Sequence, residues 1–536
     1  MFHVKDDKQP YIFDQFGHLG PKRRRLLDES WAEVFRSEIL PELPIDELRK
    51  HYHETDGRPT NEMYSMVGLM ILQQMHDLTD EEAIEQFAFN IKWHYALNIT
   101  GNSDQVSYVS LKSLWNMRNL LTEEGLYTVL FDRAAQKLAK VFEVDFAKQR
   151  IDSVHVQSNM RHLGRISLFS KTIKNFLINL KRHHRVLYDK LDQDRFIRYV
   201  NKKEESLFAA VKPSETPRTL DQLAQDTCFL VERFASTDKV NNMSCYKLLV
   251  RLFKEQCTID KGGDSNNVEK IVIAKPNKDV ASDSLQNPSD PDAGYSGHKG
   301  KGYQVQVMET YSTDPNEKQL SLITHIQVET ADKSDAHALI PAIKDTAERA
   351  MSPKELLADS LYGGDDNVQQ AKQDYNIDVV APVMGAKSKG MNLDDFLLDP
   401  DGKIIVCPQG NSPISVERPK DRFIAKFLCS DCRECPELKN CPVSEGKKAY
   451  TYYYDDKMIR LSSRRLTEDT AGFKDTYRYR AGVEATMSEY DRRTGVKHLR
   501  VRGLKAVSFA ATLKAIGVNI FRAARFKFAQ LEALVG

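Results

Sequence analysis

The sequence predicts a mixed α/β fold, on three observations. The first 145 residues show apolar side chains at helical spacing and no strand. A segment rich in β-branched residues follows at 146–159. Four further strands, expected at 302–310, 319–329, 355–364 and 377–383, then alternate with helices at 335–351 and 365–375. Such alternation is typical of a mixed sheet covered by helices.

The composition indicates a globular protein of several domains. The chain has 536 residues, of which 41% are apolar and 29% are charged. The most apolar stretch, 506–521, is interrupted by Lys514, so we expect no membrane-spanning helix. The N-terminus lacks the apolar segment of a signal peptide, and we therefore expect a cytoplasmic protein.

The helical N-terminal part, residues 1–145, is expected to form a separate domain with a role in packing or in DNA binding. Thr79 and Glu82 have the spacing of a capping box at a helix start. A helix-turn-helix is compatible with this region, although no turn signal decides it.

The region after the first strand interrupts the sheet. Residues 161–255 form a long charged helical run, and residues 256–300 are rich in Gly, Asp, Asn, Ser and Pro, which predicts a loop. A turn at 311–318 is expected to join the next two strands as a hairpin. No internal repeat is visible.

Basic residues are concentrated in two segments, although the net charge is only +1. Residues 457–536 hold 17 Lys and Arg against 7 Asp and Glu, and residues 161–212 hold 13 against 5. A basic helix is often only a solvated face, but two such segments in an otherwise acidic chain favour a polyanionic partner.

Three acidic residues occupy positions that a sheet could bring together. Asp152 lies inside the first strand, where propensity disfavours Asp. Asp359 follows the strand segment LLA, and Glu484 lies on a predicted helix. Each acid alone is more often a turn or helix cap. Together they could hold the two divalent cations that phosphoryl transfer on nucleic acid requires.

Four segments, taken in order, resemble the DDE transposases of bacterial insertion sequences. They are DSVHVQSN, DPDAGYSGHKGKGYQVQV, LLADSLYGG and YRYRAGVE. The nearest branch carries the signature Y-x2-R-x3-E-x6-K, which Tyr477, Arg480 and Glu484 match in spacing. The resemblance covers most of the chain, and residues 15 to 100 are similar to the N-terminal domain of that family.

The resemblance implies a ribonuclease-H-like fold with Asp152, Asp359 and Glu484 as catalytic ligands of Mg2+ or Mn2+. The catalytic core would comprise 146–160 and 300–384, completed by basic helices at 467–536. Residues 161–299 and 385–466 would be inserts, the first basic and helical and the second Cys-rich. The implied activity is cleavage at transposon ends and strand transfer to target DNA, in which a water and then the released 3′-hydroxyl attack. A DNA hairpin intermediate and a homodimer during reaction are also implied.

The resemblance further implies that Tyr477 and Arg480 contact a phosphate or a displaced base near the cleavage point. A Tyr/Arg helix face packed on the core is the alternative. The signature's final base is replaced by Asp491, so Arg492, Arg493 or Lys497 could take its place in binding DNA.

The segment GHKGKGY places Lys299 and Lys301 among glycines just before a strand. Glycine lets the backbone approach a phosphate, and lysine supplies positive charge. DNA binding and a flexible lead-in to a hairpin both fit this pattern, which is not a P-loop because it lacks the G-K-[ST] ending.

Five of the eight cysteines lie close together, in an intracellular chain that has too few for a disulfide scaffold. Cys429, Cys432, Cys435 and Cys441 predict a structural Zn2+ site, with Cys407 as an alternative ligand. Reduced cysteines without metal and an iron–sulfur cluster are the alternatives, although the last spacing does not fit a ferredoxin loop.

Other functions compete with transposition. A ribonuclease-H-like nuclease would need the same three acids but would not join strands. A DNA-binding protein derived from a transposase would need none of them, and a redox protein would need only the cysteines.

Overall fold

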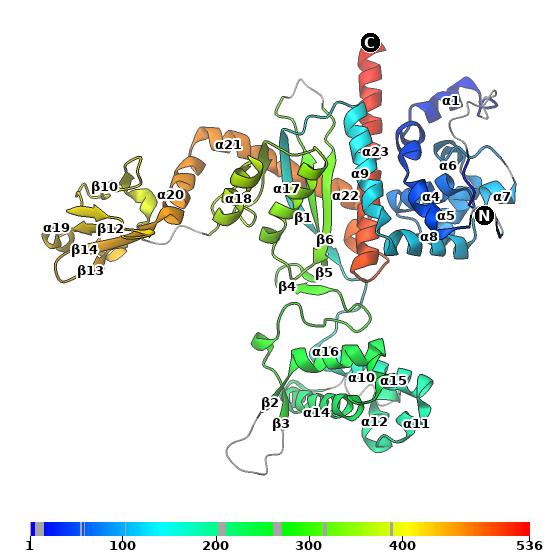
Figure 1. Ribbon diagram of the computed structural model, residues 1–536, viewed down its shortest axis with the longest axis horizontal. Coiled ribbons are helices and arrows are strands. Elements are labelled where there is room, and N and C mark those ends of the chain that lie inside the picture. The colour runs from blue at the N-terminus through cyan, green and yellow to red at the C-terminus, as the bar shows by residue number, and fades with distance from the viewer. Residues whose placement is uncertain are drawn as a thin grey trace.

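The computed structural model describes residues 2–5, 16–53, 56–57, 59–101, 103–201, 211–260, 271–314, 319–385 and 390–535. Figure 1 shows a central sheet with the N-terminal helices beside it. A helical unit lies below the sheet in this view, and a small unit of short strands extends to the left. Part of the expected 311–318 turn lies outside the described residues.

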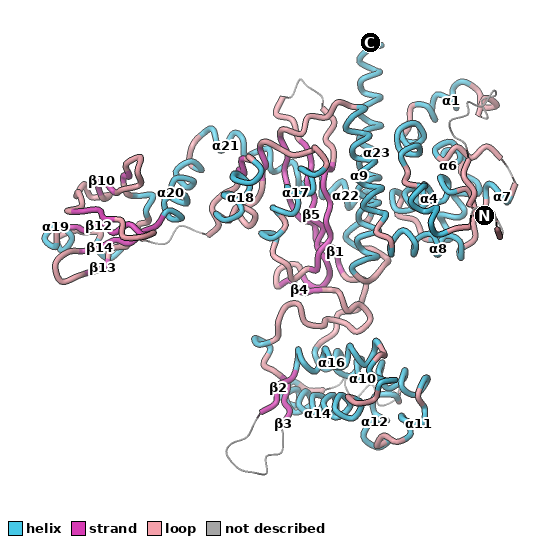
Figure 2. Tube along the Cα trace, viewed as in Figure 1, coloured by secondary structure: helices cyan, strands magenta, loops and turns pink. Residues whose placement is uncertain are grey.

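The central sheet is mixed, as the strand pattern predicts. Its strands are β1 (Lys148–Gln157), β4 (Gly294–Ser296), β5 (Gly300–Thr310), β6 (Ile323–Thr330), β7 (Glu355–Leu357) and β8 (Asp378–Val380). β5 pairs antiparallel with β1 on one side and with β4 and β6 on the other, whereas β1, β7 and β8 are parallel. Figure 2 shows these strands as one layer between helices.

Each face of the sheet is buried by different helices, which explains the near-continuous apolar strands. On one face Ile151 and Met308 pack with α17 (Leu339–Glu348) and α18 (Asp365–Tyr375), which follow the short helix η6 (Asp335–His337). On the other face Val154 and Val305 join the core formed by the N-terminal and C-terminal helices.

The N-terminal part is helical throughout its described residues. Its elements are α1 (Pro21–Asp28), α2 (Trp31–Val34), η1 (Phe35–Ile39), η2 (Leu40–Glu42), α3 (Ile45–Leu48), η3 (Arg49–His51), α4 (Met63–Met75), α5 (Asp80–Phe89), α6 (Ile91–Ala96), α7 (Asp104–Ser107), α8 (Leu111–Glu123) and α9 (Leu126–Val141). The capping box of Thr79 and Glu82 is confirmed at the start of α5. α4 and α9 pack on the long helix α23 (Leu504–Val535), so this part shares one core with the sheet.

The expectation about membrane helices needs correction for α23. In the described residues one helix, Leu504–Leu531, is long and apolar enough to cross a membrane. However, 78% of its most apolar window is buried inside the protein, as in the core helix of a globular fold. Lys514, which interrupts the apolar stretch, is buried and donates to the Thr494 carbonyl and to Asp77.

The insert between β1 and β5 has a core of its own, built from residues such as Phe169, Phe176, Leu249 and Leu252. Its elements are α10 (Arg165–His183), α11 (Arg185–Asp189), α12 (Gln193–Val200), η4 (Pro213–Glu215), α14 (Thr216–Phe234), α15 (Asp238–Asn241), α16 (Ser244–Gln256), β2 (Cys257–Asp260), β3 (Ile271–Ala274) and η5 (Asn277–Asp279). The prediction of a loop throughout 256–300 is therefore wrong. β2 and β3 pair with each other, and β4 joins the main sheet.

The Cys-rich unit has an apolar core of its own, centred on the aromatic residues of β12 and β14. It contains η7 (Leu393–Asp395), β9 (Leu397–Leu398), β10 (Ile404–Val406), β11 (Ser415–Glu417), β12 (Arg422–Phe427), α19 (Cys429–Arg433), η8 (Leu438–Asn440), β13 (Ser444–Glu445) and β14 (Tyr450–Asp455). The chain then returns to the sheet through α20 (Asp456–Glu468), α21 (Ala471–Tyr477), η9 (Arg478–Ala481), α22 (Gly482–Thr494) and η10 (Val496–His498).

Candidate active site

Asp152 and Asp359 lie side by side at one edge of the sheet. β1 and β7 are parallel, and their register pairs Lys148 with Glu355 and Arg150 with Leu357. Asp152 lies two residues beyond the last paired residue of β1, and Asp359 lies two residues beyond the end of β7. The Asp359 carboxylate is near enough to Asp152 to contribute to its raised pKa, so the two carboxylates share one site.

Asp359 lies in a turn and not at the end of a strand, which corrects the expectation of a strand over 355–364. β7 ends at Leu357, and Asp359 Oδ1 then accepts the backbone N–H groups of Leu361 (2.8 Å) and Tyr362 (3.4 Å). These bonds hold the carboxylate in a fixed orientation. Oδ2 takes no part in either bond.

The same turn is held against β8 by α20. Arg464 donates to the carbonyls of Gly363 and Ala381, both at 2.9 Å. A side chain at Gly363 would place its Cβ 2.7 Å from the Cβ of Ala381, so only glycine permits this approach. Packing thus explains the first glycine of the pair after Asp359, whereas Gly364 faces open space.

Arg480 connects Asp152 to Glu484. Its Nη2 lies 2.8 Å from Asp152 Oδ2, and its Nη1 lies 3.3 Å from Glu484 Oε1. Arg480 belongs to η9, and Glu484 lies in the first turn of α22, where the helix dipole favours a negative charge. The Glu484 side chain is 70% exposed, whereas Asp152 and Arg480 are largely buried.

The electrostatics of the site show an excess of negative charge. Burial raises the pKa of Asp152, and the nearby carboxylates of Asp359 and Asp335 raise it further. The Arg480 guanidinium and the Ser153 N–H oppose this shift in pKa but do not cancel it. Burial also raises the pKa of Tyr477, and the charges of Asp152 and Asp359 add to this, so Tyr477 lies near both acids.

The three acids fit a divalent cation by chemistry, but they do not surround a common point. Carboxylate oxygens are the ligands that Mg2+ prefers, and the raised pKa of Asp152 shows negative charge that a cation would neutralise. Within the described residues, however, no group of three His, Cys, Asp or Glu side chains has the spacing to hold a metal ion. The convergence of all three acids therefore stays a prediction: Asp359 is near enough to Asp152 to contribute to its raised pKa, whereas Arg480 lies between Asp152 and Glu484 and bonds both.

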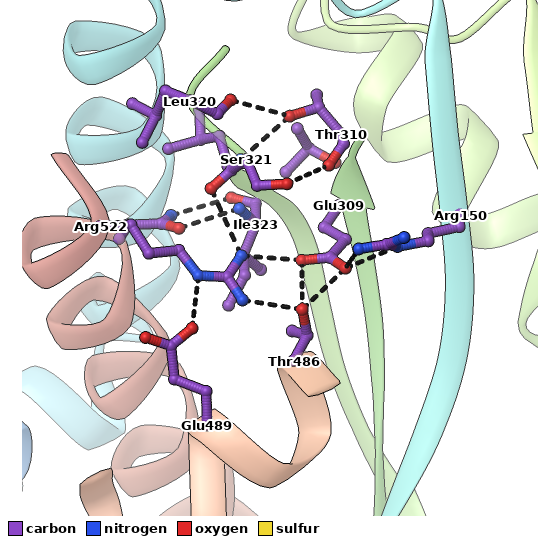
Figure 3. Close-up of polar contacts among 12 residues, drawn as sticks. Arg150, Glu309, Thr310, Leu320, Ser321, Ile323, Thr486, Glu489 and Arg522 are labelled. Atoms are coloured by element: carbon purple, nitrogen blue, oxygen red, sulfur yellow. Dashed lines mark hydrogen bonds and ion pairs between the residues drawn. The ribbon is translucent and has the colours of Figure 1, made fainter. Parts of the chain in front are cut away.

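A buried network of charges fixes α22 to the sheet. Glu309 of β5 is fully buried and accepts bonds from Arg150 of β1 and Arg522 of α23, both at 2.7 Å (Figure 3). Thr486 of α22 also donates to Glu309, and Glu489 of α22 pairs with Arg522 at 2.8 Å. Thus α22, which carries Glu484, is tied to both β5 and α23.

Arg150 also holds η9 close to the sheet. Its Nη1 donates to the Tyr479 carbonyl at 2.7 Å. A Cβ at Gly482 would come within 2.0 Å of the same nitrogen. The glycine two residues before Glu484 therefore makes room for Arg150, which itself lies two residues before Asp152.

A second network supports the site from the opposite face of the sheet. Gln306 is buried, accepts a bond from the Tyr362 hydroxyl and donates to Asp335 at 2.9 Å. Lys299 bonds Asp335 at 3.4 Å and the hydroxyl of Ser153 at 2.9 Å. The network thus joins the Asp359 turn to the neighbour of Asp152.

The sequence analysis did not single out Arg150, Gln306, Glu309 or Asp335. A signal existed for two of them, because Gln306 and Glu309 are polar residues next to the apolar Val305, Val307 and Met308. No local pattern marks Arg150 or Asp335, whose roles depend on long-range packing.

Three predicted DNA contacts lie at or just beyond the C-terminal end of α22. Arg492 and Arg493 are in its last turn, and Lys497 lies in η10, 3.8 Å from Asp491 of α22. Arg493 is on the opposite side from Glu484, with its guanidinium over the Phe521 ring and 2.9 Å from Glu489. Arg493 is therefore not brought to the acids.

Tyr477 and Lys301 have partners within the protein. The Tyr477 ring stacks on Phe473 at 5.4 Å, at the end of α21. Lys301 is half-buried and donates to the Leu163 carbonyl at 3.0 Å, and burial lowers the pKa of its ammonium group.

The structure brings Cys407 close to the other cysteines of the predicted cluster. Burial raises the pKa of the Cys432 thiol to about 11, and the nearby Cys441, Cys407 and Cys435 add to this shift. Burial also raises the pKa of Cys441, and Cys435 and Cys407 add to that shift. The Sγ of Cys407 accepts the Asn411 N–H at 3.3 Å. Cys429 packs on the same core as Cys407, Cys432 and Cys441. As for the acids, no described group of thiols has metal-binding spacing.

The fold and site together define a mixed α/β protein with an acidic centre at the edge of its sheet. Comparison with protein families gives two matches. Residues 406–524 match the transposase DDE domain, and residues 24–120 match a transposase domain designated DUF772. The chain therefore contains two transposase-type segments. The DDE match includes Glu484 and the cysteine cluster, but neither match reaches Asp152 or Asp359.

A curated relative adds a weaker likeness. The chain is 37% identical over 70 residues to the uncharacterized protein ORF8 in the nfe locus of Rhizobium meliloti. The match covers 13% of this chain and 34% of that protein, so the chain spans about a third of the length of the curated relative.

Proposed function

We propose that the protein is the transposase of a bacterial insertion sequence, which cuts DNA at the ends of its element and joins them to a target. The observation that carries this proposal is the proximity of Asp152 and Asp359 beside the paired part of β1 and β7, with Glu484 linked to Asp152 through Arg480. The two transposase-type matches give independent support.

The strand order supports a ribonuclease-H-like core. Three antiparallel strands, β6, β5 and β1, are followed by the parallel strands β7 and β8, and β1 carries the first acid at the centre of the sheet. This is the arrangement that the resemblance implies for Asp152 and Asp359.

Asp152, Asp359 and Glu484 are the residues that would hold Mg2+ or Mn2+. Such cations supply Lewis-acid activation of the phosphodiester and of the attacking water or 3′-hydroxyl. Asp359 is already oriented by its turn, with Oδ2 outside those bonds. Asp152 and Glu484 both bond Arg480, so Arg480 must release them before they can bind a cation.

The released Arg480 is suited to bind DNA at the cleavage point. Its guanidinium can form two parallel hydrogen bonds to a phosphate. Tyr477, three residues earlier, offers an aromatic ring for a base or sugar. We infer that Arg480 exchanges its carboxylate partners for a phosphate when DNA and cations bind together.

We also propose a structural Zn2+ in the Cys-rich unit, bound by Cys432, Cys435 and Cys441. Cys407 and Cys429 are both candidates for the fourth ligand, because both pack on this core beside Cys432 and Cys441. Metal content of the purified protein, compared between wild type, Cys407→Ser and Cys429→Ser, tests this choice.

A cleavage and joining assay tests the main proposal. The substrate is a DNA fragment carrying the genomic sequences that flank the coding frame, incubated with Mg2+ and a plasmid target. We expect cleaved and joined products, both lost in Asp152→Asn and Asp359→Asn. Cleavage without joining would favour a nuclease. DNA binding with no metal-dependent product would favour a non-catalytic protein.

The proposal carries two further expectations. A homodimer is expected during reaction, because two DNA ends must be held together. The protein is expected to work in the bacterial cytoplasm, where its substrate DNA lies.

A further inference from the structure

Two adjoining cavities lie at the end of β1, outside the group of acids. The first, of about 210 Å³, is formed by the end of β1, the β4–β5 turn and the segment before β4. The second, of about 300 Å³, lies between the end of β1 and η10. They share Gln157, Ser158, Met160 and Arg161, so they form one continuous hollow, called here the β1-end groove.

The lining of the groove is basic and polar. Arg161, His155, His162 and Lys299 line the first cavity, His498 lines the second, and neither cavity is lined by an acidic side chain. The carboxylate of Asp290 is fully buried and accepts hydrogen bonds from the hydroxyls of Ser158 and Tyr303. A chain with nearly equal numbers of acidic and basic residues rarely forms such a surface without an anionic ligand.

One histidine in the groove has ring nitrogens that the fold does not fully satisfy. Both ring nitrogens of His155 are buried and make no hydrogen bond of good geometry among the described residues, although the Tyr303 backbone lies close to the ring. Buried polar atoms are normally paired, so a ligand here would complete the hydrogen bonding of this ring. The backbone at Gly300 is also open, because a Cβ there would meet no atom within 4 Å.

The groove adjoins the strand that carries Asp152. Lys299 lines the groove and donates to the hydroxyl of Ser153, the residue after Asp152, and it also pairs with Asp335. A basic groove made of two joined cavities, which extends from the β4–β5 turn to η10, fits a chain of phosphates better than a single small anion. We propose that the β1-end groove binds the sugar-phosphate backbone of the DNA strand that is cut at the acidic centre. This inference rests on the proposed function and adds a binding site to it.

Gln157 offers the sharpest test, because it lines both cavities and its side chain is exposed, so a charge there does not disturb the fold. The matched control is Gln370→Glu, the same change at an exposed residue of α18. Affinity for a labelled 30-base-pair duplex is measured by fluorescence anisotropy in EDTA, between 50 and 300 mM KCl. We expect Gln157→Glu to weaken binding about fivefold and Gln157→Lys to strengthen it, with Gln370→Glu unchanged.

Arg161→Gln gives a second readout on the same duplex. We expect the slope of log affinity against log salt to become shallower by about 0.9, the value for one phosphate contact. If wild type binds steeply with salt but Gln157→Glu matches Gln370→Glu, the groove assignment is wrong and the proposed function stands. If wild type shows no salt-dependent binding, the proposed function itself fails.

A free anion is distinguished by a third measurement. Thermal stabilisation by inorganic phosphate that Arg161→Gln removes, with duplex affinity unaffected by the same variant, would assign the groove to a small anion and overturn the DNA assignment. No stabilisation by phosphate, with the expected loss of duplex affinity, supports it.

Discussion

Asp152 combines a cost in stability with a proposed role in catalysis. Because burial and the neighbouring carboxylates raise its pKa in the folded state, its charge is less favourable there than in the unfolded chain. The stability linked to this group is full below the unfolded pKa of about 3.9 and is lost as the pH rises through the folded pKa.

Asp152→Asn is therefore expected to raise the melting temperature at pH 7 while abolishing cleavage. The gain should shrink toward zero as the pH falls below about 4, where the wild-type carboxyl is also neutral. Calorimetry from below pH 4 to pH 8 measures the gain in melting temperature and its decrease at low pH, and the cleavage assay measures the loss of activity. A variant that is less stable than wild type at pH 7 would show that the Arg480 ion pair outweighs the cost of burial.

Arg480 competes with cations for Asp152 and Glu484. Arg480→Gln removes this competitor, so we expect Mn2+ affinity to rise by up to about tenfold, equivalent to 1.4 kcal/mol. Cleavage should nevertheless fall, because the proposed phosphate contact is lost. The exposed neighbour Arg478, changed to Gln, is the control and should leave both quantities unchanged. Lower Mn2+ affinity in Arg480→Gln would contradict the competition.

At the scale of elements, the position of α22 depends on Glu309. Removing one partner of a buried ion pair typically costs about 3–5 kcal/mol, because the other charge remains buried. Glu309→Gln leaves Arg150 and Arg522 without their shared carboxylate, so we expect the free energy of unfolding to fall by about 3 kcal/mol. Urea denaturation measures this. Glu417→Gln, which changes a surface ion pair in the Cys-rich unit, should leave the core transition unaffected.

The helices and strands that were predicted are those with a clear local sequence pattern. The strands near Ile151 and Val305 and the helices after β6 and β7 were predictable, because their apolar spacing is a local property. β7 is much shorter than predicted, because the side chain of Asp359 bonds the backbone that would continue the strand. β2 and β3 were not predicted, because both strands are short and the sequence around them is polar.

The residues of the site divide in the same way, into those that the sequence predicts and those whose positions depend on packing. Asp152 and Asp359 were identified from sequence, and the register of β1 with β7 brings them together. The placement of Arg480 between Asp152 and Glu484 could not be predicted, since it depends on how η9 packs against the sheet. Nor could local sequence show that Cys407, distant from Cys432 along the chain, lies near it in the fold.

At the scale of the whole molecule, the Cys-rich unit and the sheet have separate apolar cores. If Zn2+ stabilises only the Cys-rich unit, a chelator should lower one thermal transition and leave the main transition unchanged. Differential scanning calorimetry with and without the chelator measures this. A single transition that shifts as a whole, or no shift at all, would contradict a separate zinc-stabilised unit.

The central claim is that Asp152, Asp359 and Glu484 bind divalent cations together. Titration of the full chain with Mn2+, followed by electron paramagnetic resonance, tests it most directly. We expect bound Mn2+ in wild type and in Glu348→Gln, which changes an exposed carboxylate of α17. We expect at least tenfold weaker binding in Asp152→Asn, Asp359→Asn and Glu484→Gln. Equal Mn2+ binding by wild type and all three variants would contradict the claim.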